Sequence, residues 1–118
     1  MADLMSEFKS ESSDIVNQMA AILEECEEGA SGPISMENFG QLADRILGAA
    51  RQLVRNHQGG HSDLTMAAEF TQLCKLLGYK CAQLDPAGAL WPLAIAVLLD
   101  ATVELKNLIG ALTDAQGG

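Results

Sequence analysis

The sequence has few aromatic residues and few of the branched side chains that β-sheets favour. Phe, Tyr and Trp together make up 4% of the 118 residues, and Tyr and Trp occur once each. Val and Ile are sparse, whereas the unbranched residues Ala, Leu, Met and Glu are abundant. Unbranched side chains lose little rotamer freedom in a helix. The composition therefore argues against a sheet-rich domain and predicts an all-α fold.

Basic side chains are also scarce. The chain holds 7 Lys and Arg residues against 16 Asp and Glu residues, which gives a formal net charge of −9. Such a chain repels phosphate groups, so nucleic acids and anionic membrane surfaces are poor candidates as partners. Residues 1–28 contain eight of the acids and a single lysine. The last four of these acids form either a solvated acidic cap or a docking patch for a basic protein: Glu24, Glu25, Glu27 and Glu28.

The sequence lacks the pattern of a leader peptide, a membrane span or a disulfide framework. The N-terminus does not show the basic and then apolar stretch of a signal peptide. The longest apolar run, residues 87–99, contains Pro92 and is too short to cross a bilayer. Three cysteines without CxxC spacing are typical of a reducing compartment. We therefore expect one cytoplasmic domain, residues 1–118.

Three clusters rich in Gly and Pro divide the chain into four segments, and each has the composition and length of a turn between antiparallel helices. The predicted helices cover approximately residues 3–28, 35–57, 62–84 and 89–114. Ser35 is the expected N-cap of the second helix. Four such helices pack most economically as an antiparallel up-down-up-down four-helix bundle. An open three-helix core with a loose first helix is the alternative.

Apolar residues recur at intervals of three and four along each segment, which is the spacing of one helix face. Because this phase continues through Gly78, we expect one continuous helix there. Pro92 is acceptable only in the first turn of the last helix. The residues predicted to face the core are Leu4, Phe8, Ile15, Met19, Ile22 and Cys26; Phe39, Leu42, Ile46, Ala49 and Leu53; Met66, Phe70, Leu73, Leu77, Cys81 and Leu84; and Leu90, Ala94, Val97, Ala101, Leu105, Leu108 and Leu112.

The second predicted helix carries two glycines on one face. Gly40, Asp44 and Gly48 are spaced four apart, and Arg51 and Arg55 extend the same face. A glycine in an exposed helix interior costs about 1 kcal/mol relative to alanine. Either a neighbouring helix of the same chain packs closely there, or the face is kept flat so that a partner protein can approach Asp44. In the second case Gly40, Gln41, Asp44, Gly48, Arg51 and Arg55 would form the binding site.

The stretch Asp44-Arg45-Ile46-Leu47-Gly48-Ala49-Ala50 resembles the core motif of histidine-containing phosphotransfer (Hpt) domains. That motif is a histidine, two residues, a lysine, then a glycine and small residues, on one helix of a four-helix bundle. Gly48 and the two alanines match it, but Asp44 stands in the place of the phosphorylated histidine and Leu47 in the place of the lysine. The resemblance covers about seven positions. It implies a pseudo-phosphotransfer module of bacterial signalling that docks a response-regulator receiver domain without transferring phosphate.

Two other functions fit the same helix. Phosphatases of receiver aspartyl-phosphates resemble it in placing a carboxylate and an amide one turn apart, where they orient a water for in-line attack. Glu37 with Gln41, or Gln41 with Asp44, would supply such a pair. Alternatively, the glycine face is used for self-association into a homodimer.

Neither a metal site nor a nucleophilic cysteine is indicated. His57 and His61 flank a glycine pair, and even with Asp63 they fall short of the usual ligand set of zinc. Cys74 and Cys81 lie near an apolar stripe without an evident histidine base, so we interpret them as buried structural residues. We expect no cofactor and no metal.

Overall fold

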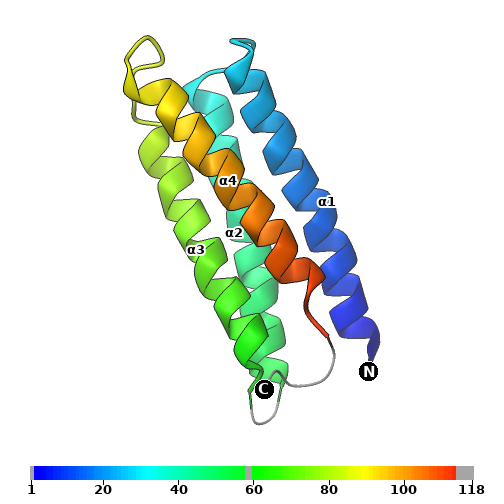
Figure 1. Ribbon diagram of the computed structural model, residues 1–118. Helices are drawn as coiled ribbons and strands as arrows, with labels where there is room; N and C mark the ends of the chain where they lie inside the picture. Colours follow the sequence, from blue (N-terminus) through cyan, green and yellow to red (C-terminus); the bar gives the residue numbers. More distant parts are fainter. Residues whose placement is uncertain (1, 58–59, 114–118) are drawn as a thin grey trace.

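The computed structural model describes residues 2–57 and 60–113 and consists of four α-helices (Figure 1). Their bounds are α1 Ala2–Glu27, α2 Pro33–Asn56, α3 Ser62–Cys81 and α4 Leu90–Gly110. In Figure 1 the colours run up α1, down α2, up α3 and down α4. The bundle measures 48 × 19 × 19 Å along its principal axes. The predicted all-α four-helix bundle is confirmed.

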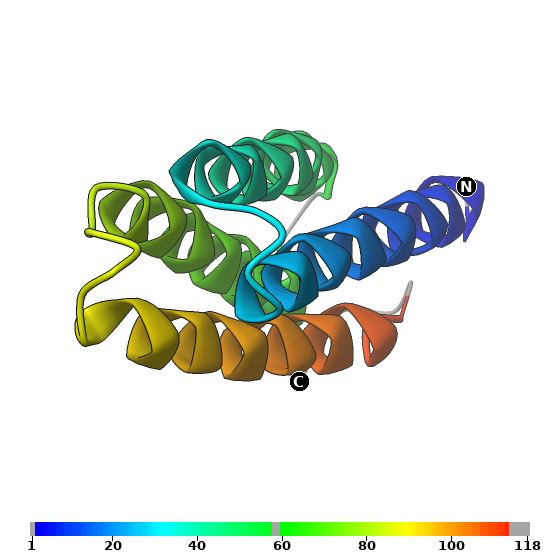
Figure 2. The ribbon, with the colours of Figure 1, turned by 90° about the horizontal axis from the view of Figure 1, so that it is seen from above.

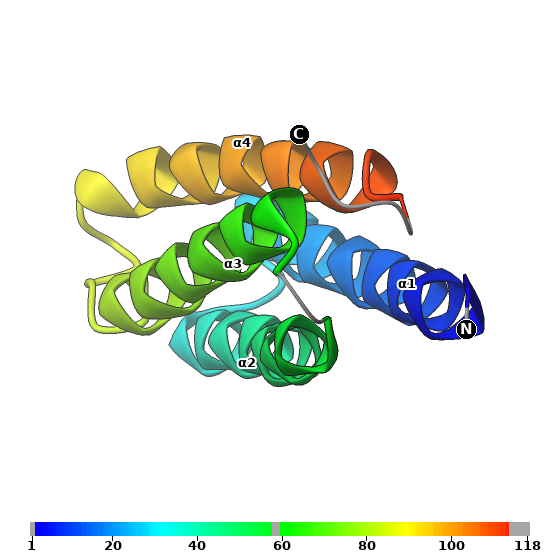
Figure 3. The same ribbon diagram turned by 90° about the horizontal axis from the view of Figure 1, so that it is seen from below.

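The helices stand at the corners of a four-sided bundle. Within the described ranges, α2 lies next to α1 and α3, and α4 lies next to α3 and α1, whereas helices on opposite corners have no Cα atoms within 8 Å of each other. The views along the bundle from above and below show this arrangement (Figures 2 and 3). The core therefore fills the space between all four helices. Its most deeply buried large side chains include Met19, Leu23, Met36, Phe39, Leu64 and Leu98.

The connection between α1 and α2 differs from the prediction. Ser35 is not the N-cap, because Gly32 occupies that position and Pro33 begins α2. Proline suits the first helical position, since its missing N–H has no intrahelical partner there and its φ already fits a helix. At the preceding helix end, Gly29 adopts a φ of +79°. The amide of Ala30 then bonds the Glu25 carbonyl oxygen at 2.9 Å, which closes the end of α1 in a Schellman motif.

The remaining helix ends agree with the sequence in part. Helix α3 is continuous through Gly78, and Pro92 lies in the first turn of α4, as predicted. However, α3 ends at Cys81 rather than at residue 84, and α4 ends at Gly110. The predicted end at residue 114 lies outside the described residues.

The predicted core face of α3 is wrong. Met66, Leu73 and Leu77 are 55%, 55% and 41% exposed, and Phe70, Cys81 and Leu84 are only half-buried. The face that packs inward carries mostly smaller residues. Its buried members are Leu64, Ala67, Ala68, Thr71, Cys74 and Gly78.

The reason is the close approach of α2 and α3. A Cβ atom placed on Gly78 would lie 2.7 Å from the Phe39 ring and 3.2 Å from the Gly40 Cα atom. Backbones at this separation accept only small side chains between them. Apart from the buried Leu64, the large apolar residues of α3 are therefore half-buried or exposed.

The other three stripes are confirmed in part. In α1 and α2 most predicted core residues are buried, although Leu4 and Ala49 are exposed. In α4 the buried face is rotated from the prediction, because Leu90 and Val97 are exposed. Its buried residues are Trp91, Ala94, Ile95, Leu98, Thr102, Leu105 and Ile109. None of the four helices, over the residues described, is long and apolar enough to cross a membrane.

Candidate functional site

The two glycines of the α2 face have different surroundings. Gly40 is buried, and a Cβ atom placed on it would lie 3.0 Å from the Tyr79 ring of α3. Close packing between α2 and α3 therefore accounts for Gly40, which is the internal-packing alternative considered above. Gly40 does not belong to the exposed part of the face.

Gly48 lies two turns further along α2 and is exposed. A Cβ atom placed there would meet no other atom of the described residues within 4 Å, apart from those of its own helix turn. An exposed glycine in a helix interior costs about 1 kcal/mol relative to alanine. Packing within the described part of the chain does not account for that cost.

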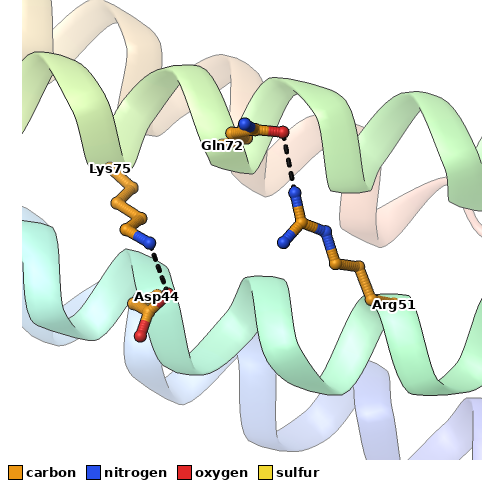
Figure 4. Close-up of polar contacts among 4 residues, drawn as sticks. All are labelled: Asp44, Arg51, Gln72 and Lys75. Carbon is orange, nitrogen blue, oxygen red and sulfur yellow. Dashed lines mark hydrogen bonds and ion pairs between the residues drawn. The ribbon is translucent and has the colours of Figure 1, made fainter.

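Asp44 lies one turn before Gly48 and forms an ion pair across the contact between the two helices. Its Oδ1 atom is 2.9 Å from the Nζ atom of Lys75 on α3 (Figure 4). The side chains of Asp44 and Lys75 are 54% and 30% exposed, so the pair lies at the surface. The sequence motif has Leu47 where an Hpt domain has lysine, and Leu47 is buried in the core. The basic group beside Asp44 is Lys75, which comes from the neighbouring helix α3.

Arg51 makes a second cross-link between the same helices. Its Nη2 atom donates a hydrogen bond to the Gln72 Oε1 atom of α3 at 2.8 Å (Figure 4). Next to this bond lies a groove of about 260 Å³ between the C-terminal half of α2 and the N-terminal half of α3. The groove is lined by Arg51, Val54, Arg55, Thr65, Ala68, Glu69 and Gln72.

Glu37 and Gln41, the other candidates on α2, are both exposed. Their spacing of four places them on the same side of the helix as Asp44. The structure thus brings the predicted carboxylate and amide groups to one surface. The carboxylate of Asp44, however, is directed to Lys75 (Figure 4).

Lys75 and Gln72 are the site residues that the sequence reasoning missed. They lie three apart on α3, so they share a face of that helix. Their partners Asp44 and Arg51 are far from them in the sequence. Only the packing of α3 against α2 brings the four side chains together.

His57 and His61 contact each other, and the hydrogen bonds of His61 hold parts of the fold together. Their rings meet edge to face with centroids 5.2 Å apart. His61 is buried, its Nδ1 atom accepts a hydrogen bond from the Leu64 amide at 3.2 Å, and its Nε2 atom lies 2.8 Å from the Thr113 carbonyl oxygen. A ring that carries its proton on Nε2 satisfies both bonds, so His61 caps α3 and ties it to Thr113 in the segment that follows α4. Across the described residues no three metal-ligating side chains come together.

Burial lowers the reactivity of the three cysteine thiols, because it raises their pKa values. Desolvation raises the pKa of the Cys74 thiol from 9.0 to about 11. Burial also raises the pKa of Cys81, and burial together with the charge of Glu25 raises that of Cys26. Thiols of this kind carry little nucleophilic thiolate near neutral pH.

The acids that end the first segment, Glu24, Glu25, Glu27 and Glu28, are all exposed. The described structure shows no ion pair for them. Their exposure fits both the solvated acidic cap and the docking patch, so the choice between the two stays a prediction.

The chain matches no protein-family model, and no curated protein or solved structure is similar to it at a significant level. The resemblance of residues 44–50 to an Hpt motif stays a prediction. The exposed face of α2 and its contact with α3 are the features that bear on function.

Proposed function

We propose that the protein is a non-catalytic binding module of signalling type, a pseudo-phosphotransfer domain that docks a receiver domain. The docking face is the exposed side of α2 and comprises Gln41, Asp44, Gly48, Arg51 and Arg55. The open environment of Gly48 is the observation that carries the proposal.

Gly48 supports docking because alanine would be the more stable residue at an exposed position in a helix. Gly40 has a reason for lacking a side chain, namely the Tyr79 ring, and Gly48 has no such reason within the described chain. A partner that packs against the helix backbone supplies one. Asp44 and Arg51 lie about one turn before and after Gly48 on the same face, and both are charged and exposed, so they give a partner polar groups to recognise around a flat centre.

We propose that the protein does not transfer phosphate, because α2 lacks the residue type that accepts it. An Hpt domain carries phosphate on an imidazole nitrogen, and α2 contains no histidine between Pro33 and Asn56. The residue in the corresponding place is Asp44, whose carboxylate is paired with Lys75. A carboxylate does not replace the imidazole as the phosphate-accepting group of this reaction. Binding without transfer is therefore the activity that the face supports.

The test is the binding of purified receiver domains to the wild-type protein and to Gly48→Arg. The arginine side chain projects from the centre of the docking face, and we expect the affinity to fall by about 100-fold. Gly110→Arg is a matched control, because Gly110 is also exposed and equally open but lies at the end of α4. Circular dichroism would establish that both variants fold.

The proposal is wrong if no receiver binds the wild-type protein or if Gly48→Arg binds as the wild type does. Dephosphorylation of a phosphorylated receiver is a second readout. If the protein accelerates it, and Glu37→Ala, Gln41→Ala or Asp44→Ala removes the effect, the module is a phosphatase instead. Light scattering that shows a dimer, converted to a monomer by Gly48→Arg, would assign the face to self-association.

A further inference from the structure

We infer that the groove between α2 and α3 binds an acidic side chain of the docked protein, held by the guanidinium groups of Arg51 and Arg55. The inference rests on the proposed function, because both arginines belong to the docking face as well as to the groove. It specifies the chemistry of the partner, which is a protein surface that presents a carboxylate next to an apolar side chain.

The first argument is the distribution of charge over the bundle. Helix α1 contains seven acids and one lysine, whereas α2 contains two acids and three arginines. The acids and bases of α3 are equal in number. The α2/α3 side is therefore the least acidic side of a strongly acidic molecule, and α1 lies away from the outer surface of this side (Figure 2). An acidic partner is repelled by α1 and steered to the groove.

The second argument is the construction of the groove. Its α2 wall carries Arg51 and Arg55, and Val54 and Ala68 supply its apolar surface. The hydrogen bond from Arg51 to Gln72 holds one guanidinium group at the groove. Guanidinium groups bind carboxylates through charge-assisted hydrogen bonds, and holding them in place lowers the entropic cost of binding.

The third argument is the acid on the opposite wall. Glu69 projects from α3 into the lining of the same groove. It repels a carboxylate placed against α3, so an acidic side chain of the partner is directed to the arginine wall. The groove thus has a basic wall and an acidic one, which fixes the orientation of the bound side chain as well as its charge.

The experiment uses a soluble amphipathic peptide of Glu, Ala and Leu as the probe and a matched peptide with Lys in place of Glu. Binding to the full chain is followed by titration calorimetry and by amide NMR shifts. We expect the acidic peptide to bind at the groove residues and the basic peptide not to bind there. Arg51→Gln combined with Arg55→Gln should weaken acidic-peptide binding at least about tenfold. Glu69→Gln should strengthen it about threefold, because the repulsion is removed.

Arg45→Gln is the matched control, since Arg45 is an exposed arginine of α2 that does not line the groove. An equal loss of affinity in Arg45→Gln would show general attraction and overturn the inference, as would preferential binding of the basic peptide. Groove shifts that change on dilution without peptide would assign the groove to a second copy and also overturn it.

The same variants applied to a receiver that binds the wild-type protein separate the two proposals. If Gly48→Arg abolishes receiver binding but Arg51→Gln with Arg55→Gln leaves it unchanged, the inference fails and the docking face stands. If no receiver binds while the acidic peptide does, the proposed function fails instead.

Discussion

The carboxylate of Asp44 and the ammonium group of Lys75 lie 2.9 Å apart and join α2 to α3 beside the open backbone at Gly48. The hydrogen bond from Arg51 to Gln72 joins the same helices two turns further along α2 (Figure 4). Both links lie at the surface of a contact whose interior is formed by Gly40 and Gly78. The exposed side of α2 that we propose as the docking face is therefore supported by close packing below it and by polar cross-links at its edge.

The ion pair itself should add little to stability, because exposed pairs of this kind contribute about 0–1 kcal/mol. A double-mutant cycle with Asp44→Asn and Lys75→Met, measured by urea unfolding, is expected to give a coupling free energy below about 1 kcal/mol. The same two variants should change partner binding more than they change stability. A coupling of several kcal/mol would instead make the pair a structural element of the bundle.

The three glycines of α2 and α3 should respond differently to alanine. Gly78→Ala is expected to lower the free energy of unfolding by roughly 1–3 kcal/mol, because its Cβ atom would lie 2.7 Å from the Phe39 ring. Gly40→Ala should also destabilise, although the 3.0 Å contact with Tyr79 involves a ring that can move. Gly48→Ala, in open surroundings, should raise stability by about 1 kcal/mol. Urea unfolding of the three variants checks this order, and a destabilised Gly48→Ala would contradict it.

The helices were predictable from the sequence, but the core face of α3 was not, and that of α4 was predictable only in part. The pattern of Met66, Leu73 and Leu77 has helical spacing, and it predicts a core face by the size of its residues. The structure selects the face with small residues instead, because the contact of Gly40 with Tyr79 and of Gly78 with Phe39 brings two backbones together. Helical periodicity does not distinguish two apolar faces of one helix when the deciding factor is how closely a neighbour packs.

The candidate site was predictable only on its α2 side. The spacing of Asp44, Gly48 and Arg51 identified one face, since positions along a single helix follow from the sequence. Lys75 and Gln72 come from another helix, and the register between α2 and α3 is set by three-dimensional packing. Because this register cannot be read from the sequence, the pairing of Asp44 with Lys75 could not be predicted.

The cap formed by His61 gives a third prediction. His61→Ala removes the acceptor for the Leu64 amide and the group that contacts the Thr113 carbonyl oxygen. Loss of an N-cap costs roughly 0.5–2 kcal/mol, and we expect His61→Ala to lower the free energy of unfolding by an amount near the upper end. His61→Asn keeps a capping oxygen and should recover part of the loss. Equal stabilities of His61→Ala and the wild type in urea unfolding would show that the cap is unimportant.

The last prediction concerns the alkaline stability of the bundle. Burial raises the pKa of Cys74 from 9.0 to about 11, so the folded state holds this proton more tightly than the unfolded state does. The resulting stabilisation is fully present below about pH 9 and is lost as the pH rises to about 11. A difference of this size corresponds to roughly 3 kcal/mol at most.

Cys74→Ala removes this titration, so its free energy of unfolding should fall less steeply between pH 9 and pH 11 than that of the wild type. Urea unfolding at matched pH values measures the difference between the two proteins, in which the contributions of the side chains that they share cancel. Cys81→Ala is the control, because Cys81 is only half-buried and should change the slope less. Parallel pH profiles of Cys74→Ala and the wild type would mean that Cys74 ionises as easily in the folded protein as in the unfolded chain.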